Sequence, residues 1–370
     1  MRNDLPEIKQ ALKDQIERVC TELLPNGQRE GTKWRACSPH DANQKHLPDL
    51  VVALKGEVGA WKSWRENVSG DVIKLIIYCH NTDFKGALQW ARDFLGLRAM
   101  SHAERQAMRQ VAEAKAKRDE RDNERARLYK LKKAVELFEV QAIGMGSGSA
   151  AERHARAYFN ARQCGLEHVA YVNRESFRFA NHSEWWKGAK WTSANGYREK
   201  LMEGPHFPAI HCAMRQATGA ITCCHVTFLD PVHPTKAPVT PAKLMFGEAS
   251  GAVIEVSTGP TGLPFWRADQ GAATPLIIAE GVETALSLAI AMPQARVWAG
   301  GSLAGMGTAP VHLACVSDVT VARDNNIKNA AAHSALAKAI AQLEAHGKPL
   351  VVMRSHVGDD FNDLIKGEAA

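Results

Sequence analysis

The sequence predicts an α/β fold whose C-terminal third builds a mostly parallel sheet flanked by helices. Residues 275–279 form an apolar run that is long enough for a buried strand and too short for a helix. Residues 282–292 are rich in Ala and Leu and predict a helix that ends before Pro293. The same alternation recurs to the end of the chain, and parallel strands need such crossover connections.

The later elements follow this pattern. Further strands are predicted at residues 296–299, 318–323 and 349–354, and a helix at residues 330–346. In open sheets of this kind, ligands bind outside the carboxyl ends of the strands. Residues that follow those ends are therefore the first candidates for a functional site.

Three carboxylates, Glu280, Asp324 and Asp360, follow predicted strands at this edge. Like charges held close together resist joint ionisation, so such a group is costly unless a cation or a reaction uses it. Mg²⁺ typically takes one or two carboxylates together with substrate phosphates. The sequence therefore predicts a magnesium site for phosphoryl chemistry.

Three motifs carry a family resemblance. They are IAEGVETAL at residues 278–286, VARDNN at 321–326 and GDDFNDL at 358–364, each at a predicted strand end. In this order they resemble the Toprim domain of DnaG-type DNA primases from plasmids and phages. The resemblance covers roughly the last 100 residues and predicts a Toprim domain at residues 266–370.

The resemblance implies a role for each acidic or amide side chain of these motifs. Glu280, Asp324 and Asp360 would be catalytic, with Glu280 as general base or further metal ligand. Asn362 and Asp363 would orient Asp360. The implied ligands of Mg²⁺ or Mn²⁺ are Glu280, Asp324, Asn326 and Asp360. Glu283, one helical step beyond Glu280, is interpreted as a capping or surface charge.

Position 326 departs from the family pattern, which has Asp-x-Asp where this chain has Asp324-Asn-Asn326. The amide oxygen of Asn326 still coordinates a cation, but it carries no charge. Weaker Mg²⁺ binding is expected, because an amide is a poorer ligand for a hard cation than a carboxylate.

The composition sets wider limits. A chain of 370 residues with 45% hydrophobic and 23% charged residues is typical of a soluble protein of two to three domains. No apolar stretch reaches membrane-spanning length, and the first residues do not form a signal peptide. Eight scattered cysteines indicate reduced thiols in the cytoplasm. The net charge of +6 is compatible with a nucleic-acid partner.

Residues 1–97 predict a small module that opens with a helix at 5–24. Cys37-Ser-Pro-His40 and the GDVIKL run at residues 70–75 resemble the N-terminal zinc-binding domain of DNA primases. The second cysteine pair is missing, because AWKSWR stands at residues 60–65. Cys37 and His40 are then at most a vestigial zinc site, since structural zinc takes four ligands.

Zinc is therefore not expected in this zinc-ribbon-like module. We expect Trp61 and Trp64 to pack as a core in place of the metal. The module would keep a surface that contacts DNA.

Residues 98–148 predict a charged helical linker. From Ser101 to Lys133 there are eleven Lys or Arg against six Asp or Glu. Two interpretations stay open, a solvated linker helix and a basic arm that follows a phosphate backbone. The glycine- and serine-rich residues 144–149 predict a flexible break before the next domain.

Residues 149–265 predict a small α+β domain, the first part of a primase core. Runs at 207–214 and 220–230 flank Ala217-Thr-Gly219 as the arms of a hairpin. The run HVTFLD at residues 225–230, with the lysines after it, again resembles plasmid and phage primases. Lys236 and Lys243, joined by Arg215, would bind nucleotide or template phosphates. His225 is interpreted as structural.

Taken together, the resemblance implies a DNA primase that makes short RNA primers on single-stranded DNA with Mg²⁺ or Mn²⁺. Its partners would be the single-stranded DNA template, ribonucleoside triphosphates and a replicative helicase, with no membrane. Two alternatives stay open: a primase-derived single-stranded DNA-binding protein that has lost catalysis, and a Toprim phosphodiesterase or nuclease.

Overall fold

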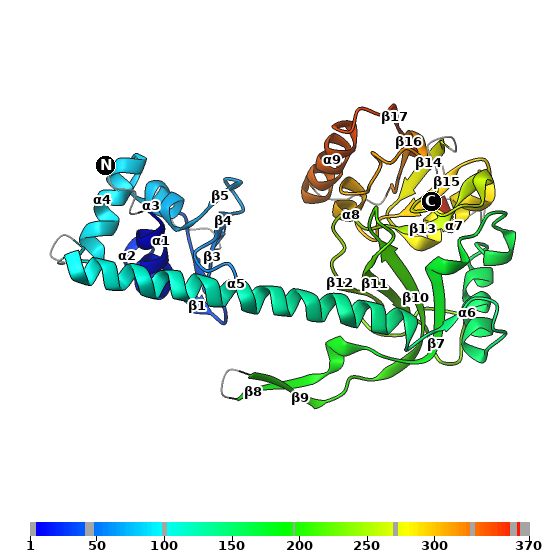
Figure 1. Cartoon of the computed structure of the whole chain (residues 1–370), viewed down its shortest axis with the longest axis horizontal. Helices are drawn as coiled ribbons and strands as arrows, with labels where there is room; N and C mark the ends of the chain where they lie inside the picture. Colours follow the sequence, from blue (N-terminus) through cyan, green and yellow to red (C-terminus); the bar gives the residue numbers. More distant parts are fainter. Residues whose placement is uncertain are drawn as a thin grey trace. The chain divides into compact units, whose positions relative to one another are not determined.

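The computed structural model describes residues 5–40, 48–97, 102–194, 197–268, 273–325, 330–355 and 361–362 (Figure 1). The chain forms two compact units, Met1–Glu124 (unit 1) and Arg125–Ala370 (unit 2). The boundary falls within helix α5 (His102–Glu139), which contributes residues to both units. No helix among the described residues is long and apolar enough to cross a membrane.

Unit 1 packs helices against an antiparallel sheet of five short strands in the order β1-β2-β3-β4-β5. The strands are β1 (Gln28–Glu30), β2 (Lys33–Ala36), β3 (Leu50–Ala53), β4 (Trp61–Ser63) and β5 (Val68–Gly70). The helices are α1 (Leu5–Asp14), α2 (Ile16–Leu23), α3 (Val72–His80) and α4 (Phe84–Phe94). The single helix expected at residues 5–24 is therefore two helices, which meet at Gln15.

The two tryptophans of unit 1 have different environments. Trp61 is buried at 5% exposure, and its Nε1 donates to the Asp71 carbonyl oxygen at 3.0 Å. Trp64 is 65% exposed, and the Lys62 ammonium lies 3.9 Å from its ring centroid. The expectation that both pack as core is wrong for Trp64. Successive side chains of a strand point to opposite faces, and Trp61 and Ser63 of β4 are buried, so Trp64, three residues after Trp61, falls on the outer face with Lys62.

Helix α5 is solvated along most of its length but buried at its end. Its last turns place Ala134, Leu137 and Phe138 in a hydrophobic cluster with residues of the unit 2 sheet. The Leu137 carbonyl oxygen also lies 2.7 Å from Nδ1 of the buried His211. The end of the predicted linker is therefore part of the core of unit 2.

The glycine-rich segment after α5 is an ordered turn, so the predicted flexible break is wrong. The backbone N–H groups of Gly146 and Gly148 both donate to the Glu152 carboxylate at 2.9 Å. Ser149 caps helix α6 (Ala150–Ala161) by accepting from the Glu152 N–H at 3.2 Å. The Glu152 carboxylate holds this turn in place, and the glycine-rich composition alone does not predict that contact.

The first sheet of unit 2 is antiparallel, in the order β12-β11-β10-β7-β6. Its strands are β6 (Ile143–Gly144), β7 (Phe177–Glu184), β10 (His206–Arg215), β11 (Ile221–Phe228) and β12 (Lys243–Gly247). The predicted hairpin is β10–β11, whose turn includes Gly219 at a φ of +84°. Two further strands, β8 (Lys190–Ala194) and β9 (Tyr197–Met202), form a separate two-stranded sheet.

The second sheet of unit 2 has the order β13-β15-β14-β16-β17. Strands β14 (Thr274–Ala279), β15 (Arg296–Ala299), β16 (Val316–Arg323) and β17 (Leu350–Arg354) are parallel to their neighbours, as predicted. Strand β13 (Ile254–Ser257) was not predicted, and it pairs antiparallel with β15. This sheet therefore begins before residue 266.

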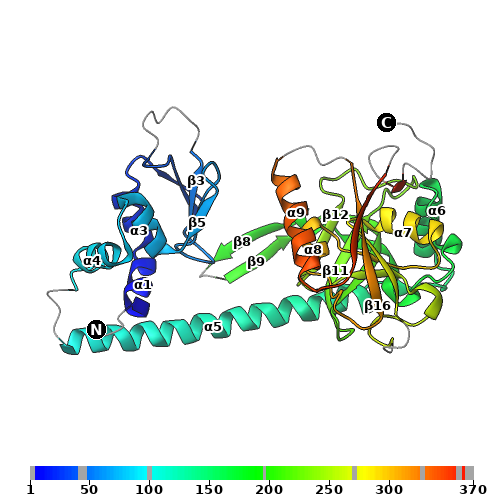
Figure 2. The same cartoon turned by 90° about the horizontal axis from the view of Figure 1, so that it is seen from above.

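Helices cover both faces of this sheet, as Figure 2 shows. Helix α7 (Val282–Ala291) packs on the face that carries Ile277 and Ala279. Helices α8 (Leu303–Gly307) and α9 (Ala330–Glu344) pack on the face that carries Ile278 and Trp298. Alternation along the strands supplies apolar side chains to both faces, as a sheet buried on both sides requires.

A buried ion pair joins β13 to β15. The Glu255 and Arg296 side chains are both fully buried, and the guanidinium donates to the carboxylate. Glu255 also accepts from Asn173 Nδ2 at 2.8 Å and from the Phe265 N–H at 3.2 Å. Burial raises the pKa of Glu255 to about 7, while Arg296 acts to lower it. These bonds satisfy the carboxylate inside the core.

Candidate active site

The carboxyl ends of β14 and β16 bring two predicted acids to one edge of the sheet. The strands are parallel neighbours, with Ala279 in register with Ala322. Glu280 directly follows β14, and Asp324 directly follows β16. Because paired strands lie about 4.8 Å apart, both residues start from the same short stretch of the edge. The structure brings Glu280 and Asp324 together in this sense.

Glu280 is half-buried, and two opposing effects act on its carboxyl group. Burial raises its pKa above the ordinary value, and the nearby Lys243 ammonium acts in the opposite direction. A carboxyl group with a raised pKa is closer to the range in which it exchanges protons near neutral pH. Lys243 belongs to β12, so the antiparallel sheet supplies a cation to this edge.

Asn326, Asp360 and Asp363 lie outside the described residues, so their predicted places at this site stay predictions. Asn362 is fully buried. Its Nδ2 donates to the Arg162 carbonyl oxygen at 2.7 Å and to Ser287 Oγ at 3.0 Å. These bonds connect Asn362 to the C-cap residue of α6 and to α7.

Glu283 is a buried partner of two lysines, so its interpretation as a capping or surface charge is wrong. Its Oε2 lies 2.7 Å from Lys243 Nζ, and its Oε1 lies 3.4 Å from Lys236 Nζ. The Tyr158 hydroxyl donates to Oε1 at 2.7 Å. Burial acts to raise the pKa of Glu283, but the two lysines hold it well below its usual value.

Lys236 and Lys243, the two predicted phosphate-binding lysines, converge on Glu283 and stay partly open to solvent. Their side chains are 37% and 32% exposed. Burial lowers the pKa of Lys236, although Glu283 opposes that shift. Two ammonium groups face one carboxylate, which leaves a positive charge beside Glu280. His225 adds no charge, because burial and then Lys243 lower its pKa to about 4.

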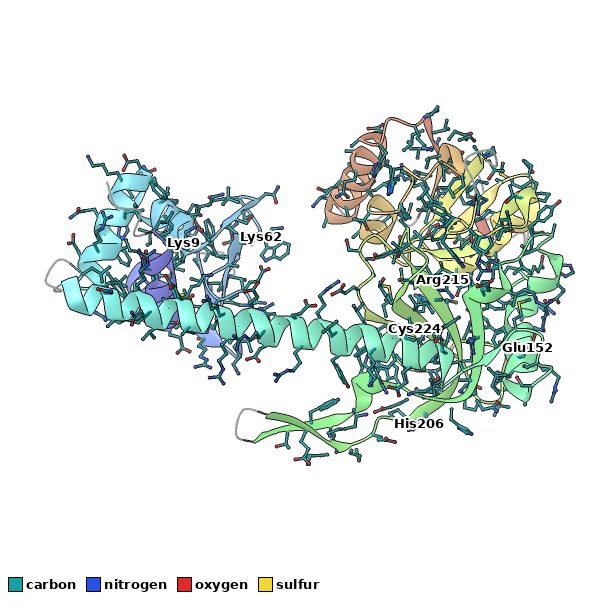
Figure 3. The ribbon with its side chains drawn as sticks, in the orientation of Figure 1. Lys9, Lys62, Glu152, His206, Arg215 and Cys224 are labelled. Atoms are coloured by element: carbon teal, nitrogen blue, oxygen red, sulfur yellow. The ribbon has the colours of Figure 1, made fainter. Side chains whose placement is uncertain are left out.

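Arg215 is the last residue of β10, at the end that leads into the β10–β11 turn (Figure 3). It pairs with Ile221 on β11, whereas Lys243 pairs with Thr227, six residues along the same strand. At about 3.4 Å per residue, Arg215 and Lys243 are about 20 Å apart along the strand direction. The structure therefore does not bring Arg215 together with the lysines. Its Nη1 instead donates to the Gly219 carbonyl oxygen at 2.8 Å, within the β10–β11 turn.

A pocket of about 350 Å³ adjoins the Glu283 cluster. Its lining residues are Tyr158, Ala161, Arg162, Pro234, Thr235 and Lys236. Sequence reasoning missed Tyr158 and Arg162. The available signal was their spacing of four residues, which places two side chains on one face of a helix. The Arg162 guanidinium lies 6.0 Å from the Tyr158 ring centroid.

The vestigial zinc residues of unit 1 have other roles in the structure. His40 Nε2 lies 2.6 Å from the Tyr78 carbonyl oxygen, and its ring contacts the Tyr78 ring edge-on at 4.8 Å. Cys37 is half-buried. Within the described part of the chain, no group of three or more His, Cys, Asp or Glu side chains is placed to hold a metal ion. Metal-free folding of this module stays a prediction.

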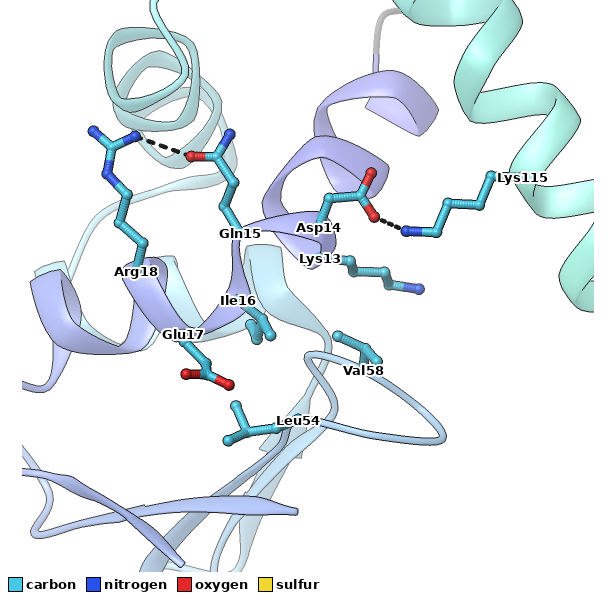
Figure 4. Close-up of a pocket in the computed structure, with 9 residues that line it drawn as sticks. All are labelled: Lys13, Asp14, Gln15, Ile16, Glu17, Arg18, Leu54, Val58 and Lys115. Carbon is cyan, nitrogen blue, oxygen red and sulfur yellow. Dashed lines mark hydrogen bonds and ion pairs between the residues drawn. The ribbon is translucent and has the colours of Figure 1, made fainter. Parts of the chain in front are cut away.

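A second pocket, of about 420 Å³, lies in unit 1 (Figure 4). Its charged lining residues are Lys13, Asp14, Glu17, Arg18 and Lys115. The signs are mixed, and Lys115 of α5 forms an ion pair with Asp14. The pocket therefore does not favour a ligand of one charge. Lys115 is also engaged within unit 1, rather than being an open position of a basic arm.

Comparisons with known proteins identify two regions. A model of the Toprim domain matches residues 275–370, and a model described as a domain of unknown function (DUF7146) matches residues 138–256. No curated protein matches the chain.

Several solved structures are similar to parts or all of the chain. The zinc-binding and RNA polymerase domains of Aquifex aeolicus primase are 14% identical, cover 99% of this chain and 83% of that one, and have a TM-score of 0.37. A DnaG primase catalytic domain bound to single-stranded DNA is 17% identical, with coverages of 67% and 79% and a TM-score of 0.40. The E. coli primase catalytic core is 16% identical, with coverages of 60% and 71% and a TM-score of 0.38.

Proposed function

Residues 275–370 are a Toprim domain, as their motifs predicted, and on this premise we propose that the chain is a DNA primase. It would join ribonucleotides into short primers on single-stranded DNA. The observation that carries the proposal is the composition of one sheet edge. Glu280 and Asp324 follow neighbouring parallel strands, and Lys243 lies close enough to Glu280 to act on its pKa.

The acidic residues at this edge fit a divalent metal ion. Carboxylate oxygens are the ligands that Mg²⁺ prefers, and Mg²⁺ typically takes one or two of them beside substrate phosphates. Glu280 and Asp324 would hold Mg²⁺ or Mn²⁺, joined in the proposal by Asp360 and Asn326. When bound, the metal neutralises triphosphate charge and promotes attack by a hydroxyl group.

The side chains of this chain would contribute proton transfer and positioning. Glu280, with its raised pKa, is suited to accept a proton from the attacking hydroxyl. Lys236 and Lys243 would bind the triphosphate, because they outnumber the one carboxylate between them and stay partly open. Glu283 and Tyr158 would act on these lysines by holding their ammonium groups in place.

Asn326 lowers the metal affinity that we expect of this site. The site has one negative charge fewer than the family pattern, so Mg²⁺ should bind more weakly. We expect low primer synthesis in Mg²⁺, higher synthesis in Mn²⁺, and a gain from Asn326→Asp. Metal affinity of wild type and Asn326→Asp, measured by titration calorimetry, gives a readout that does not depend on activity.

The test is primer synthesis from labelled ribonucleotides on single-stranded DNA, in Mg²⁺ and in Mn²⁺. Asp324→Ala and Glu280→Ala should abolish the products. Asp318→Ala is the matched control. Asp318 lies on β16, near the end of the strand that is opposite to Asp324. It should leave synthesis unchanged.

The outcomes separate the alternatives. Primers that persist in Asp324→Ala would contradict the assigned site. A shortened template would identify a Toprim nuclease instead. Binding of single-stranded DNA without products from wild type or Asn326→Asp, in either metal, would identify the non-catalytic binding protein.

A further inference from the structure

Residues 185–194 and 197–202, which contain strands β8 and β9 and the turn before them, form a ribbon whose two strands pair only with each other among the described residues (Figure 1). Trp191 of β8 is in register with Lys200 of β9. An isolated two-stranded hairpin is marginal in water. The ribbon therefore depends on contacts at its base to keep its shape.

The base of the ribbon is anchored in unit 2. Trp185 Nε1 donates to the Pro241 carbonyl oxygen at 3.0 Å, and the Trp186 ring packs edge-on against Phe228 with centroids 5.8 Å apart. Glu184 accepts from the Gly204 N–H at 2.9 Å and from Lys200 Nζ at 2.6 Å. Two of the three tryptophans of this region are thus used for attachment.

The third tryptophan, Trp191, lies on β8 of the ribbon itself. Trp191 is 40% exposed, and its neighbours across the ribbon, Leu201 and Met202, are 67% and 49% exposed. The Lys200 ammonium lies 5.5 Å from the Trp191 ring centroid. Lys187 and Lys190 are exposed on the same segment. The ribbon presents an aromatic ring and apolar side chains among cations.

The charge of the ribbon is concentrated. Residues 185–202 contain four Lys or Arg, at positions 187, 190, 198 and 200, against a single Glu at position 199. The resulting charge of +3 compares with +6 for all 370 residues. This positive charge favours an anionic partner over a neutral or cationic one.

We propose that this ribbon binds single-stranded nucleic acid, with a base stacked on Trp191 and phosphates near Lys187 and Lys190. An exposed aromatic ring flanked by lysines is the arrangement that binds unpaired bases and their backbone together. A duplex hides its base faces, so it would use the lysines but not the ring. This proposal adds a template-binding surface to the proposed function, and its observations lie at residues that the catalytic site does not use.

The experiment measures binding of the full chain to a 5′-labelled single-stranded oligo-dT by fluorescence anisotropy over a range of salt concentrations. Trp191→Ala should weaken binding by about fivefold or more, the loss expected for one stacked base, and Trp191→Phe should restore most of it. Lys187→Ala with Lys190→Ala should lower the salt slope by about 1.4, at about 0.7 per phosphate contact.

Matched controls are Tyr171→Ala, which removes another exposed aromatic ring, and Lys338→Ala, which removes an exposed lysine of α9. Both should bind as wild type. Circular dichroism should show the same fold in every variant. Photocrosslinking with 5-iodouracil in the oligonucleotide, followed by mass spectrometry, should place a crosslink on residues 190–202.

Parallel titrations with oligo-rU and with duplex DNA distinguish the sources of the ligand. Tighter binding of oligo-dT than of oligo-rU would identify a DNA template strand, and the reverse would identify RNA. Wild-type affinity and salt slope in all ribbon variants would overturn the proposal, as would equal sensitivity of duplex binding to Trp191→Ala. If the chain makes no primers but the ribbon substitutions still weaken oligonucleotide binding, only the proposed function is contradicted.

Discussion

Lys243 Nζ lies 2.7 Å from Glu283 Oε2, and this contact joins the antiparallel sheet of unit 2 to the first turn of helix α7. Helix α7 starts at Val282, two residues after Glu280 at the carboxyl end of β14. The pair therefore places a cation of one sheet beside a candidate acid of the other. Its energy and its role can be tested separately from catalysis.

Glu283→Gln should destabilise the protein by about 2 kcal/mol. The substitution leaves Lys243 and Lys236 half-buried without their counter-charge, and the loss is below the ~3–5 kcal/mol of a fully buried pair because both lysines reach solvent. Urea unfolding measures the change, and a double-mutant cycle with Lys243→Met isolates the pair.

The control for this prediction is Glu175→Gln, which removes the exposed partner of Arg267. Surface ion pairs contribute about 0–1 kcal/mol, so little change is expected. A coupling energy near zero between Glu283 and Lys243 would contradict the structural assignment.

Glu152→Gln should cost about 2 kcal/mol at pH 7, because the carboxylate accepts from two backbone N–H groups and from Arg156. Burial acts to raise the pKa of Glu152, but these donors lower it to about 2. A lowered carboxyl pKa adds stability above the unfolded value of about 4.5, and that stability is lost as the pH falls toward 2.

The difference between wild type and Glu152→Gln should therefore shrink by about 1 kcal/mol between pH 6 and pH 4. Urea midpoints at both pH values measure it. Glu203→Gln, at a 67% exposed side chain, is the control. A pH-independent difference would show that the loop does not depend on the ionised carboxylate.

His211 should make stability fall as the solution is acidified. The ring is fully buried, with Nε2 at 2.6 Å from Ser183 Oγ and Nδ1 at 2.7 Å from the Leu137 carbonyl oxygen. Burial lowers its pKa to about 4. The unfolded chain takes up a proton near pH 6.5 and the folded chain does not, so stability is complete above pH 6.5 and is lost toward pH 4.

By pH 5 this histidine alone should cost about 2 kcal/mol. His211→Asn should reduce the loss of stability between pH 7.5 and pH 5 by that amount, whatever it does to stability at pH 7.5. His182→Asn, at an exposed position, should leave the pH dependence unchanged. An unaltered slope in His211→Asn would mean that the ring takes up its proton in the folded state.

Unit 1 should fold without zinc. Elemental analysis of the purified full chain should find no stoichiometric zinc, and chelation should leave its urea unfolding unchanged. Trp61→Ala should destabilise unit 1 by about 3–5 kcal/mol, because it removes a buried aromatic side chain. The exposed Trp64 provides the matched comparison, with a change within about 0.5 kcal/mol expected for Trp64→Ala.

Stoichiometric zinc that is lost together with the fold of unit 1 would contradict this prediction. Equal destabilisation by the two tryptophan substitutions would contradict the difference in packing between Trp61 and Trp64.

Local patterns in the sequence determined the parallel sheet and the position of its candidate acids. Strand and helix periodicity, and the termination of α7 before Pro293, are properties of neighbouring residues. Glu280 and Asp324 follow their strands directly, and the carboxyl ends of parallel strands meet at one edge. The placement of these two acids could therefore be predicted without coordinates.

Only the tertiary structure decided which side chains meet across long separations in sequence. Tyr158 and Glu283 are 125 positions apart, and Lys243 and Glu283 are 40 apart. Helical spacing placed Glu283 near the helix start but carried no information about which sheet would cover it. Charged side chains are mostly exposed unless they are paired, so the burial of Glu283 against Lys236 and Lys243 could be recognised only in the tertiary structure. Likewise Trp61 and Trp64 have the same chemistry, but their spacing of three puts them on opposite faces of the chain, and only the structure shows which face packs on the core of unit 1.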